Sequence, residues 1–187
     1  TSGPRILLWF DLINSPEGQV PMGSVITMSQ NPRFIIKAAG SFKQNPGCSN
    51  ESIDSLSSER LEYLCAGECY NPSNEREIIE QIEIIKITPQ LYTGEAVSPL
   101  IQDPWKTIPC QGTGECIVEF EDQNFSRDSV YYVRAIQNPT PAINGSTLSE
   151  RDNFELCKGS FRTNLQDDCL SMTNERAWSS PIYVNKP

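Results

Sequence analysis

The sequence predicts a mainly β protein that folds as an antiparallel β-sandwich. Short runs rich in β-branched and aromatic residues recur along the chain, and turn residues separate them. Long helical patterns do not alternate with these runs, which argues against a parallel sheet built from βαβ units. The run at 129–137 places Tyr131, Val133 and Ala135 on one face and further apolar residues on the other. Apolar residues on both faces are typical of a central strand, so we expect the sandwich to be organised around this run.

The other predicted strands follow from the same patterns. We expect strands at 5–13, 33–39, 78–88, 116–121 and 180–184. Residues 19–28 predict a short edge strand, because Pro21 has no backbone N–H for a central position. Residues 91–107 contain Gly94, Pro99 and Pro104 and are predicted to form a loop.

Two segments depart from the β pattern within what we expect to be a single domain covering residues 1–187. Residues 40–75 predict an insertion that contains cysteines and a short helix. Ser57 stands at the position of a helix cap, with Leu56 and Leu61 placed as a hydrophobic staple. Residues 138–176 show no sustained periodicity and predict a long loop before the last strand.

The end of the chain has a local likeness to known sandwiches. The alternation Tyr131-x-Val133-x-Ala135, followed by Trp178-Ser-Ser-Pro-Ile182, looks like the last two strands of an immunoglobulin or fibronectin type III domain. We therefore expect a sandwich of this kind. The likeness carries no information about function, because many unrelated functions share this architecture.

Composition excludes several classes of partner. The chain has 15 basic and 24 acidic residues, a net charge of −9, which argues against nucleic acid or anionic lipid. No apolar run approaches the roughly 20 residues that a membrane-spanning helix needs. The sequence begins at Thr1 without a basic-plus-apolar signal segment, so we expect it to be a processed or excised piece of a longer polypeptide.

Seven cysteines and no histidine form the most informative part of the composition. Without histidine, this chain alone cannot use Ser-His-Asp or Cys-His catalysis, and no cofactor is expected. Many cysteines in a chain rich in turn residues suit an oxidising compartment. An odd number leaves at least one sulfur without a partner in the chain.

The cysteine spacings predict disulfide bonds in preference to a metal site. Cys110 and Cys116 flank a turn just before a predicted strand, and we expect them to pair. We expect Cys157 and Cys169 to close part of the long loop, and two of the remaining three to pair. These three are Cys48, Cys65 and Cys69. A zinc site is the competing interpretation, but the spacings lack a Cys-x-x-Cys pair.

Acidic residues offer two weaker candidate sites. Glu119 and Glu121 share one face of a predicted strand, as a carboxylate pair for glycoside hydrolysis would, although carboxylates on an outer face are more often solvated. Acidic residues of the long loop could supply oxygen ligands to Ca²⁺, although their spacing matches no known calcium loop. The candidates of this second kind are Asp152, Asp167 and Asp168.

A contact surface is the remaining candidate. Trp105 follows Asp103 and Pro104 in a predicted loop, and Pro139 and Pro141 lie in the long loop. Loops at one end of a sandwich commonly carry binding residues, so Asp103, Trp105 and the two prolines are candidates for this role. Trp105 could equally cap the core.

Several motifs spread along the chain carry a more specific resemblance. They are Gly3-Pro-Arg5, Leu8-Trp-Phe10, Pro21-Met-Gly23, Gly47-Cys48, Leu64-Cys-x-Gly-Glu-Cys-Tyr-Asn-Pro72, Ile82-Glu-x-x-Lys-Ile-x-Pro-Gln90, Asp103-Pro-Trp105, Tyr131-Tyr-Val-Arg-Ala-Ile-Gln137, Pro139-Thr-Pro-Ala-Ile-Asn144, Asp168-Cys-Leu170 and Arg176-Ala-Trp-Ser-Ser-Pro-Ile182. Together they resemble the carboxy-terminal region of a bacterial protein family of unassigned function. One position departs, since Ser149 stands where similar sequences usually have a cysteine.

The resemblance implies that this chain is one part of a longer protein whose catalytic-type domain lies upstream. Full-length members of this family are mostly expected to be secreted or periplasmic. They are similar to metal-dependent hydrolases of the polymerase-and-histidinol-phosphatase (PHP) superfamily, whose metal ligands lie upstream of the region matched here. The resemblance thus implies that this chain is a β-rich carboxy-terminal part, with the upstream catalytic-type domain as its partner. A binding module for carbohydrate or protein, of an adhesive kind, is the alternative.

Overall fold

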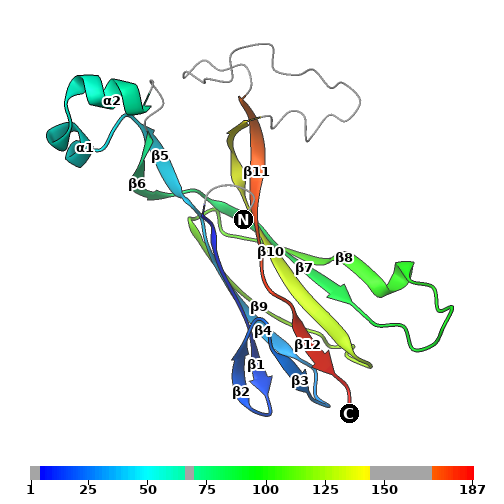
Figure 1. Cartoon of the computed structure of the whole chain (residues 1–187). Helices are drawn as coiled ribbons and strands as arrows, with labels where there is room; N and C mark the ends of the chain where they lie inside the picture. Colours follow the sequence, from blue (N-terminus) through cyan, green and yellow to red (C-terminus); the bar gives the residue numbers. More distant parts are fainter. Residues whose placement is uncertain (1–4, 66–69, 144–169) are drawn as a thin grey trace. The chain divides into compact units, whose positions relative to one another are not determined.

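The computed structural model describes residues 5–65, 70–143 and 170–187 (Figure 1). The chain divides into two compact units. Unit 1 comprises Thr1–Ser41, Glu77–Asn138 and Glu175–Pro187, and unit 2 comprises Phe42–Arg76 and Pro139–Asn174. The expectation of a single domain with an insertion at 40–75 stays a prediction.

The smaller sheet of unit 1 is antiparallel and runs in the order β2 (Gly18–Pro21), β1 (Leu7–Ser15), β4 (Arg33–Ala39), β9 (Glu115–Glu121). The strands expected near 5–13, 33–39 and 116–121 are confirmed. The single edge strand expected at 19–28 is two strands. One is β2, and the other is β3 (Val25–Thr27), which belongs to the larger sheet.

The larger sheet runs in the order β3, β12 (Ile182–Asn185), β10 (Ser129–Ile143), β7 (Ile79–Ile87), β8 (Ile101–Pro109), and β11 (Leu170–Trp178) pairs with β10. The pairs along this order are antiparallel except β12 with β3, which is parallel. β10 lies between β12 and β7, so the central position expected for 129–137 is confirmed.

Strand β8 corrects the prediction of a loop at 91–107. A short 3₁₀ turn, η1 (Ser98–Leu100), leads into it. The pairing of β7 with β8 is irregular between Ile84 and Lys86, and the cis peptide bond Asp103–Pro104 lies opposite this irregularity. A proline can stand at such a place because it is not required to donate to the ladder. The proline that indicated a loop marks a bulge in an edge strand.

Unit 2 also holds more regular structure than expected. β5 (Phe42–Pro46) pairs with β6 (Tyr70–Arg76), and two helices, α1 (Asn50–Ser55) and α2 (Ser58–Cys65), lie between them in the sequence where one was expected. The predicted cap is confirmed, since the Arg60 amide donates to the Ser57 hydroxyl oxygen at 3.2 Å. β10 continues to Ile143 and β11 begins at Leu170, so both ends of the expected loop are strand.

Side chains from both sheets of unit 1 form one hydrophobic core. Phe10, Phe34 and Phe120 stack on the smaller sheet, and the Phe34 ring lies 4.8 Å from the ring of Tyr131 on β10. Tyr131, Val133 and Ala135 are fully buried, as their alternation predicted. A core shared between two mainly antiparallel sheets is the arrangement expected of a β-sandwich.

The disulfide between Cys110 and Cys116 confirms the predicted pair and joins the two sheets. Cys110 directly follows β8 at the edge of the larger sheet, and Cys116 lies in β9 at the edge of the smaller one. The Lys106 ammonium also donates to the backbone oxygen of Glu121 at 3.2 Å, which connects the same two strands. The bond therefore closes the open side between the layers, in addition to stapling a turn.

Removing this disulfide should destabilise unit 1. We expect Cys110→Ser/Cys116→Ser to lower the free energy of unfolding by about 2 kcal/mol, the loop-closure entropy of a short loop. Urea unfolding of the double variant, compared with the untreated and the reduced wild-type protein, measures the loss. An unchanged midpoint would show that the contacts of β8 and β9 close this edge without the bond.

Gly40 lies where the backbone passes close to the start of β7. A Cβ atom at this position would stand 1.9 Å from the carbonyl oxygen of Glu77. The Gly40 amide also donates to the Gly114 carbonyl oxygen at 2.8 Å, which holds the residue in place. A side chain here can be accommodated only if backbone moves.

We therefore expect Gly40→Ala to cost at least about 3 kcal/mol of stability, the upper end for overpacking, because the clash is with backbone. The control is Gly94→Ala, where nothing lies within 4 Å of the added methyl group and only the positive φ of 93° opposes the change. Thermal unfolding of the two variants should show the larger loss at Gly40. Equal losses would argue against the close contact.

Candidate functional site

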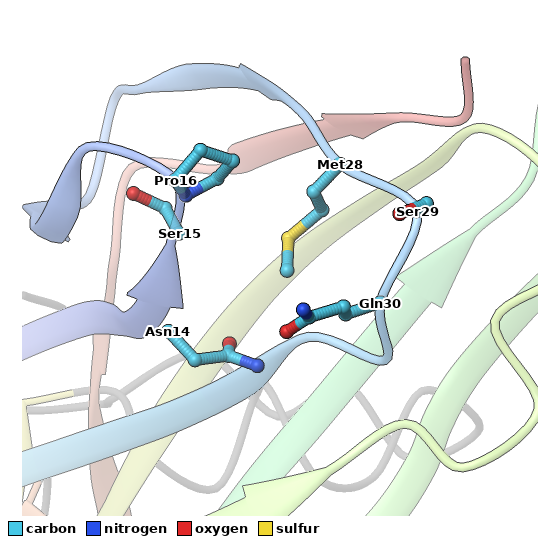
Figure 2. Close-up of a pocket in the computed structure, with 6 residues that line it drawn as sticks. All are labelled: Asn14, Ser15, Pro16, Met28, Ser29 and Gln30. Atoms are coloured by element: carbon cyan, nitrogen blue, oxygen red, sulfur yellow. The ribbon is translucent and has the colours of Figure 1, made fainter.

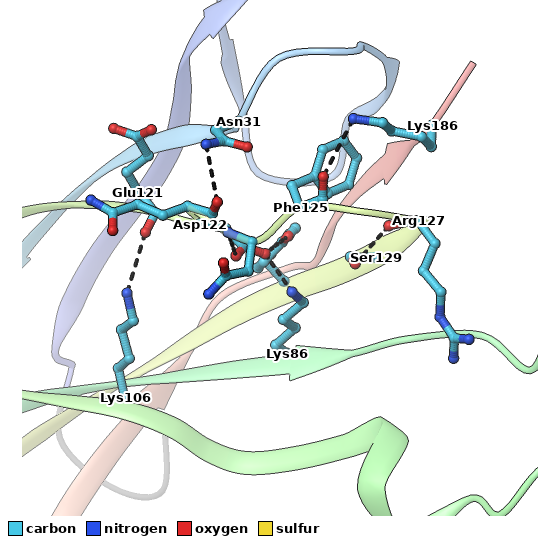
Figure 3. Close-up of polar contacts among 12 residues, drawn as sticks. Asn31, Lys86, Lys106, Glu121, Asp122, Phe125, Arg127, Ser129 and Lys186 are labelled. Atoms are coloured by element: carbon cyan, nitrogen blue, oxygen red, sulfur yellow. Dashed lines mark hydrogen bonds and ion pairs between the residues drawn. The ribbon is translucent and has the colours of Figure 1, made fainter.

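The titratable side chains that gather in unit 1 meet beside the end of β9. Asp122 directly follows this strand and is fully buried. Its Oδ2 accepts a hydrogen bond from the Tyr131 hydroxyl at 2.6 Å and lies 2.5 Å from the Lys86 ammonium. Its Oδ1 accepts from the backbone amide of Asn124 at 3.1 Å. Figure 3 shows Lys86 reaching Asp122 from β7 below the turn.

The local sequence explains how the three side chains converge. Lys86 continues the inward-facing positions of Ile82 and Ile84, both fully buried, and Tyr131 is the first inward-facing aromatic residue of β10. Asp122 ends the alternation of β9, where the chain turns toward β10. A lysine at a position where the strand period calls for an apolar residue is the signal that could have revealed this cluster from the sequence.

The electrostatics of the cluster favour a closed ion pair. Burial raises the pKa of Asp122, but the hydrogen bonds from Lys86 and Tyr131 outweigh it, so that the pKa lies below its ordinary value. Burial, followed by the neighbouring carboxylate, raises the pKa of the Tyr131 phenol far above its ordinary value. Asp122 therefore stays ionised and Tyr131 stays protonated at neutral pH, so that the phenol donates its hydrogen bond to the carboxylate.

Trp105 packs against the core, which is the second of the two roles predicted for it. Its ring lies edge-on to Phe120 at 6.2 Å and tilted against Tyr131 at 6.2 Å. The ammonium groups of Lys86 and Lys106 lie 5.2 Å and 4.3 Å from the ring centre. The half-buried indole is therefore in contact with other side chains of the same protein.

Asp103, the second residue of the predicted contact surface, is engaged as well. Its carboxylate binds the guanidinium of Arg134 through both oxygens. The Arg134 Nε also lies 2.8 Å from the Glu83 carboxylate. Pro139 and Pro141 lie in the part of β10 that belongs to unit 2. A contact surface formed by these prolines together with Asp103 and Trp105 therefore stays a prediction.

The two carboxylate residues of β9 make separate contacts. Glu119 lies 3.6 Å from Arg33, and both side chains are more than half exposed. Glu121 contributes its backbone oxygen to Lys106. Across residues 5–65, 70–143 and 170–187, no group of three or more His, Cys, Asp or Glu side chains is placed to hold a metal ion.

Several predicted residues lie outside the described part of the chain. They are Cys69, Cys157, Cys169, Asp152, Asp167 and Asp168. The predicted pair of Cys157 with Cys169 and the weak calcium site therefore stay predictions. Cys48 is disulfide-bonded, and Cys65 is the last residue of α2. That two of Cys48, Cys65 and Cys69 pair with each other stays a prediction.

A small hollow of about 230 Å³ lies between the end of β1 and the segment before β4 (Figure 2). Met28 forms part of its wall, with Asn14 and Ser15 beside it. The polar groups here serve the fold: the Asn14 side chain donates to the Asn31 carbonyl oxygen at 2.9 Å and accepts from the Arg33 amide at 2.8 Å. The Ser15 hydroxyl donates to the Gly18 carbonyl oxygen at 2.6 Å. No charged side chain lines the hollow.

Comparison with models of protein families gives a match over part of the chain. A family model described as "Protein of unknown function (DUF3604)" matches residues 106–186. This range contains both cysteines of the inter-sheet disulfide, Asp122 and Tyr131, whereas Lys86 precedes it. The match supports the expected resemblance to a protein domain of unassigned function. Searches of curated proteins and of solved structures found no match.

No helix among the described residues is long and apolar enough to cross a membrane. This agrees with the absence of a long apolar run in the sequence.

Removing the Asp122 carboxylate should destabilise the fold strongly. We expect Asp122→Asn to cost about 3 kcal/mol, because Lys86, 13% exposed, loses the charge that compensates its burial. Tyr131→Phe should cost about 1 kcal/mol, the loss of one hydrogen bond. Tyr132→Phe, on the opposite face of β10, is the matched control and should change stability little. Similar losses in all three variants would contradict a specific role for the cluster.

The same carboxylate predicts how stability depends on pH. Because the pKa of Asp122 is lower in the folded than in the unfolded state, its contribution is complete above about pH 5 and is lost as the pH falls through the folded-state value. Urea unfolding between pH 7 and pH 3 should show wild-type stability decreasing below about pH 4. Asp122→Asn should show a smaller decrease over this range, and an identical decrease would mean that other carboxylates cause the acid sensitivity.

Proposed function

We propose that this chain is a non-catalytic accessory β-domain of a larger exported polypeptide, and that any chemistry of that polypeptide belongs to a PHP-like metal-dependent hydrolase domain. In this proposal the chain packs on, or orients, that neighbouring domain. The motifs that run along the sequence support the proposal, as does the match to a domain of unassigned function over residues 106–186.

The burial and mutual pairing of the titratable cluster is the observation that carries the non-catalytic role. A catalytic acid or base must reach the substrate within hydrogen-bond distance. Asp122 is instead fully buried, and both of its oxygens are occupied by groups of the same unit. Arg134 is engaged in the same way with Glu83 and Asp103. These groups support the fold and leave no reactive atom available to a substrate.

The strand order supports a sandwich of the immunoglobulin or fibronectin type III kind. In such domains the strands alternate between two antiparallel sheets, and the last two strands are neighbours in one sheet. In unit 1, β12 pairs with β10, β10 with β7, and β4 lies between β1 and β9. The Tyr131 hydroxyl, near the start of β10, bonds back to Asp122 upstream, similar in position to the tyrosine that marks this corner in immunoglobulin domains. The architecture alone does not define a function.

The disulfides support an exported location, secreted or periplasmic. Cys110 pairs with Cys116 and Cys48 is disulfide-bonded. Structural disulfides persist in oxidising compartments and are rare in the cytosol of most organisms.

The experiment compares this chain with the complete polypeptide that carries it. We expect the isolated 187-residue chain not to hydrolyse phosphomonoesters or phosphodiesters when Mn²⁺ or Zn²⁺ is added, whereas the complete polypeptide does. Addition of the separate chain to the separate upstream domain should change the stability or activity of that domain. Metal-dependent turnover by the isolated chain at enzyme-like rates would overturn the proposal, as would a complete polypeptide without a second domain.

A further inference from the structure

A row of apolar side chains crosses the larger sheet of unit 1 on the face that points away from the core. We call it the apolar row, and it consists of Val25, Tyr183, Val130, Ile87 and Ile101. Each is the direct cross-strand partner of the next, on β3, β12, β10, β7 and β8 in turn. The row therefore spans the full width of this sheet, whose strands are labelled in Figure 1.

The neighbours of the apolar row in the sequence define its orientation. Ile26, Tyr131, Ile182 and Val184 are buried in the core between the sheets. Because successive side chains of a strand point to opposite faces, the members of the row point outward. Three of them are largely accessible: the exposed fraction is 65% for Val25, 42% for Tyr183 and 48% for Ile101.

A second apolar line lies next to the row on the same face. Tyr132 pairs directly with Ile85, two residues along β10 and β7 from the pair of Val130 with Ile87. Ile85 is fully buried, yet it is not a member of the core between the two sheets. The outer face of the larger sheet thus carries packed apolar side chains that are separate from the core between the two sheets.

Such a face is unusual for a sheet that borders water. Outer faces of antiparallel sandwiches normally alternate to polar residues, whereas strands covered on both sides are apolar throughout. Exposed apolar groups are also present in the segment between β7 and β8, where Leu91 is 70% and Tyr92 is 65% exposed. Contiguous apolar surface of this kind marks an interaction site.

The charged side chains near the apolar row make contacts within the protein. Asp128, which precedes Val130 by two residues, is exposed, and its Oδ1 accepts a hydrogen bond from the Lys186 backbone amide at 2.7 Å. Arg134, Glu83 and Asp103, further along the same face, are paired with one another. The residues that flank the ends of the row are uncharged, among them Ser24, Thr27 and Gln102. The surface that complements the row itself is therefore mainly apolar.

The size of the row indicates how the partner is held. Four strand spacings of roughly 4.8 Å make it roughly 19 Å long, and two lines of side chains make it roughly 7 Å across, before side-chain margins are added. The resulting few hundred Å² are well below the roughly 800 Å² per partner of a stable complex between free proteins. A contact of this size becomes stable when the two surfaces belong to one polypeptide and their effective concentration is high.

We propose that the apolar row is the surface on which an apolar face of a second domain of the same polypeptide docks. This inference rests on the proposed accessory function and specifies which face of the sandwich performs it. The row is covered in the complete polypeptide, and the opposite outer face, on the smaller sheet, is not.

The test is hydroxyl-radical footprinting of the complete polypeptide and of the 187-residue chain. Tyr183 reports on the row, and Trp9, 48% exposed on the outer face of the smaller sheet, is the internal control. We expect the labelling rate of Tyr183 to be at least fivefold lower in the complete polypeptide than in the isolated chain. The labelling rate of Trp9 should be the same in both.

Two matched variants separate docking from folding. Val25→Lys places a charge in the row, and Ile117→Lys places one on β9 at the outer face of the smaller sheet. Both positions lie on edge strands, and their exposed fractions are 65% and 64%. Both isolated variants should unfold at the wild-type urea midpoint. In the complete polypeptide, Val25→Lys should restore the labelling of Tyr183, and Ile117→Lys should leave it protected.

The remaining outcomes overturn the inference in distinguishable ways. Equal labelling of Tyr183 in both proteins would overturn the docking surface while leaving the accessory role intact. Concentration-dependent protection of Tyr183 in the isolated chain would show that a second copy occupies the row. A complete polypeptide without a second domain would overturn the proposed function together with this inference.

Discussion

A buried carboxylate at the end of one sheet holds unit 1 together at the point where the chain crosses to the other. Asp122 leaves β9 of the smaller sheet and is bound by Lys86 and Tyr131, which belong to the larger one. A buried charge without a partner would strongly destabilise the folded state. The fold of unit 1 therefore requires all three side chains in this arrangement. Their mutual dependence specifies how the sheets meet at this end.

The neighbouring edge of the two sheets is closed by different means. The disulfide from Cys110 to Cys116 crosses from β8 to β9, and Trp105 covers the same edge with its ring against Phe120. Lys106 adds a hydrogen bond to the backbone of β9. Edge strands are a general liability of sheet proteins, because their free backbone groups can pair with other chains. Trp105, which was a candidate contact residue, here helps to protect an edge.

This use of its polar and aromatic residues explains why unit 1 suits an accessory role. Asp122 is paired with Lys86 and Arg134 with Glu83 and Asp103, and the most prominent aromatic candidate, Trp105, is packed against the core. What remains available is a hydrophobic outer face, and such a face is suited to contact with another protein surface. The proposed docking role accordingly depends on shape and apolar area.

The sequence alone determined the strands whose side-chain alternation is strong, the central position of β10, the Ser57 helix cap and the pairing of Cys110 with Cys116. These features depend on local periodicity and short separations, which a single sequence displays directly. Strand β8 could not be predicted in the same way, because Pro104 is a turn signal locally and is tolerated only through the bulge formed with β7.

The tertiary structure decided the features that depend on register between distant strands. Lys86 and Asp122 are 36 residues apart in the sequence, and only the packing of the two sheets makes each the partner of the other. The members of the apolar row come from five strands, each contributing one ordinary apolar residue. Cross-strand register aligns them, and register is set by the pairing of whole strands, which no local pattern records.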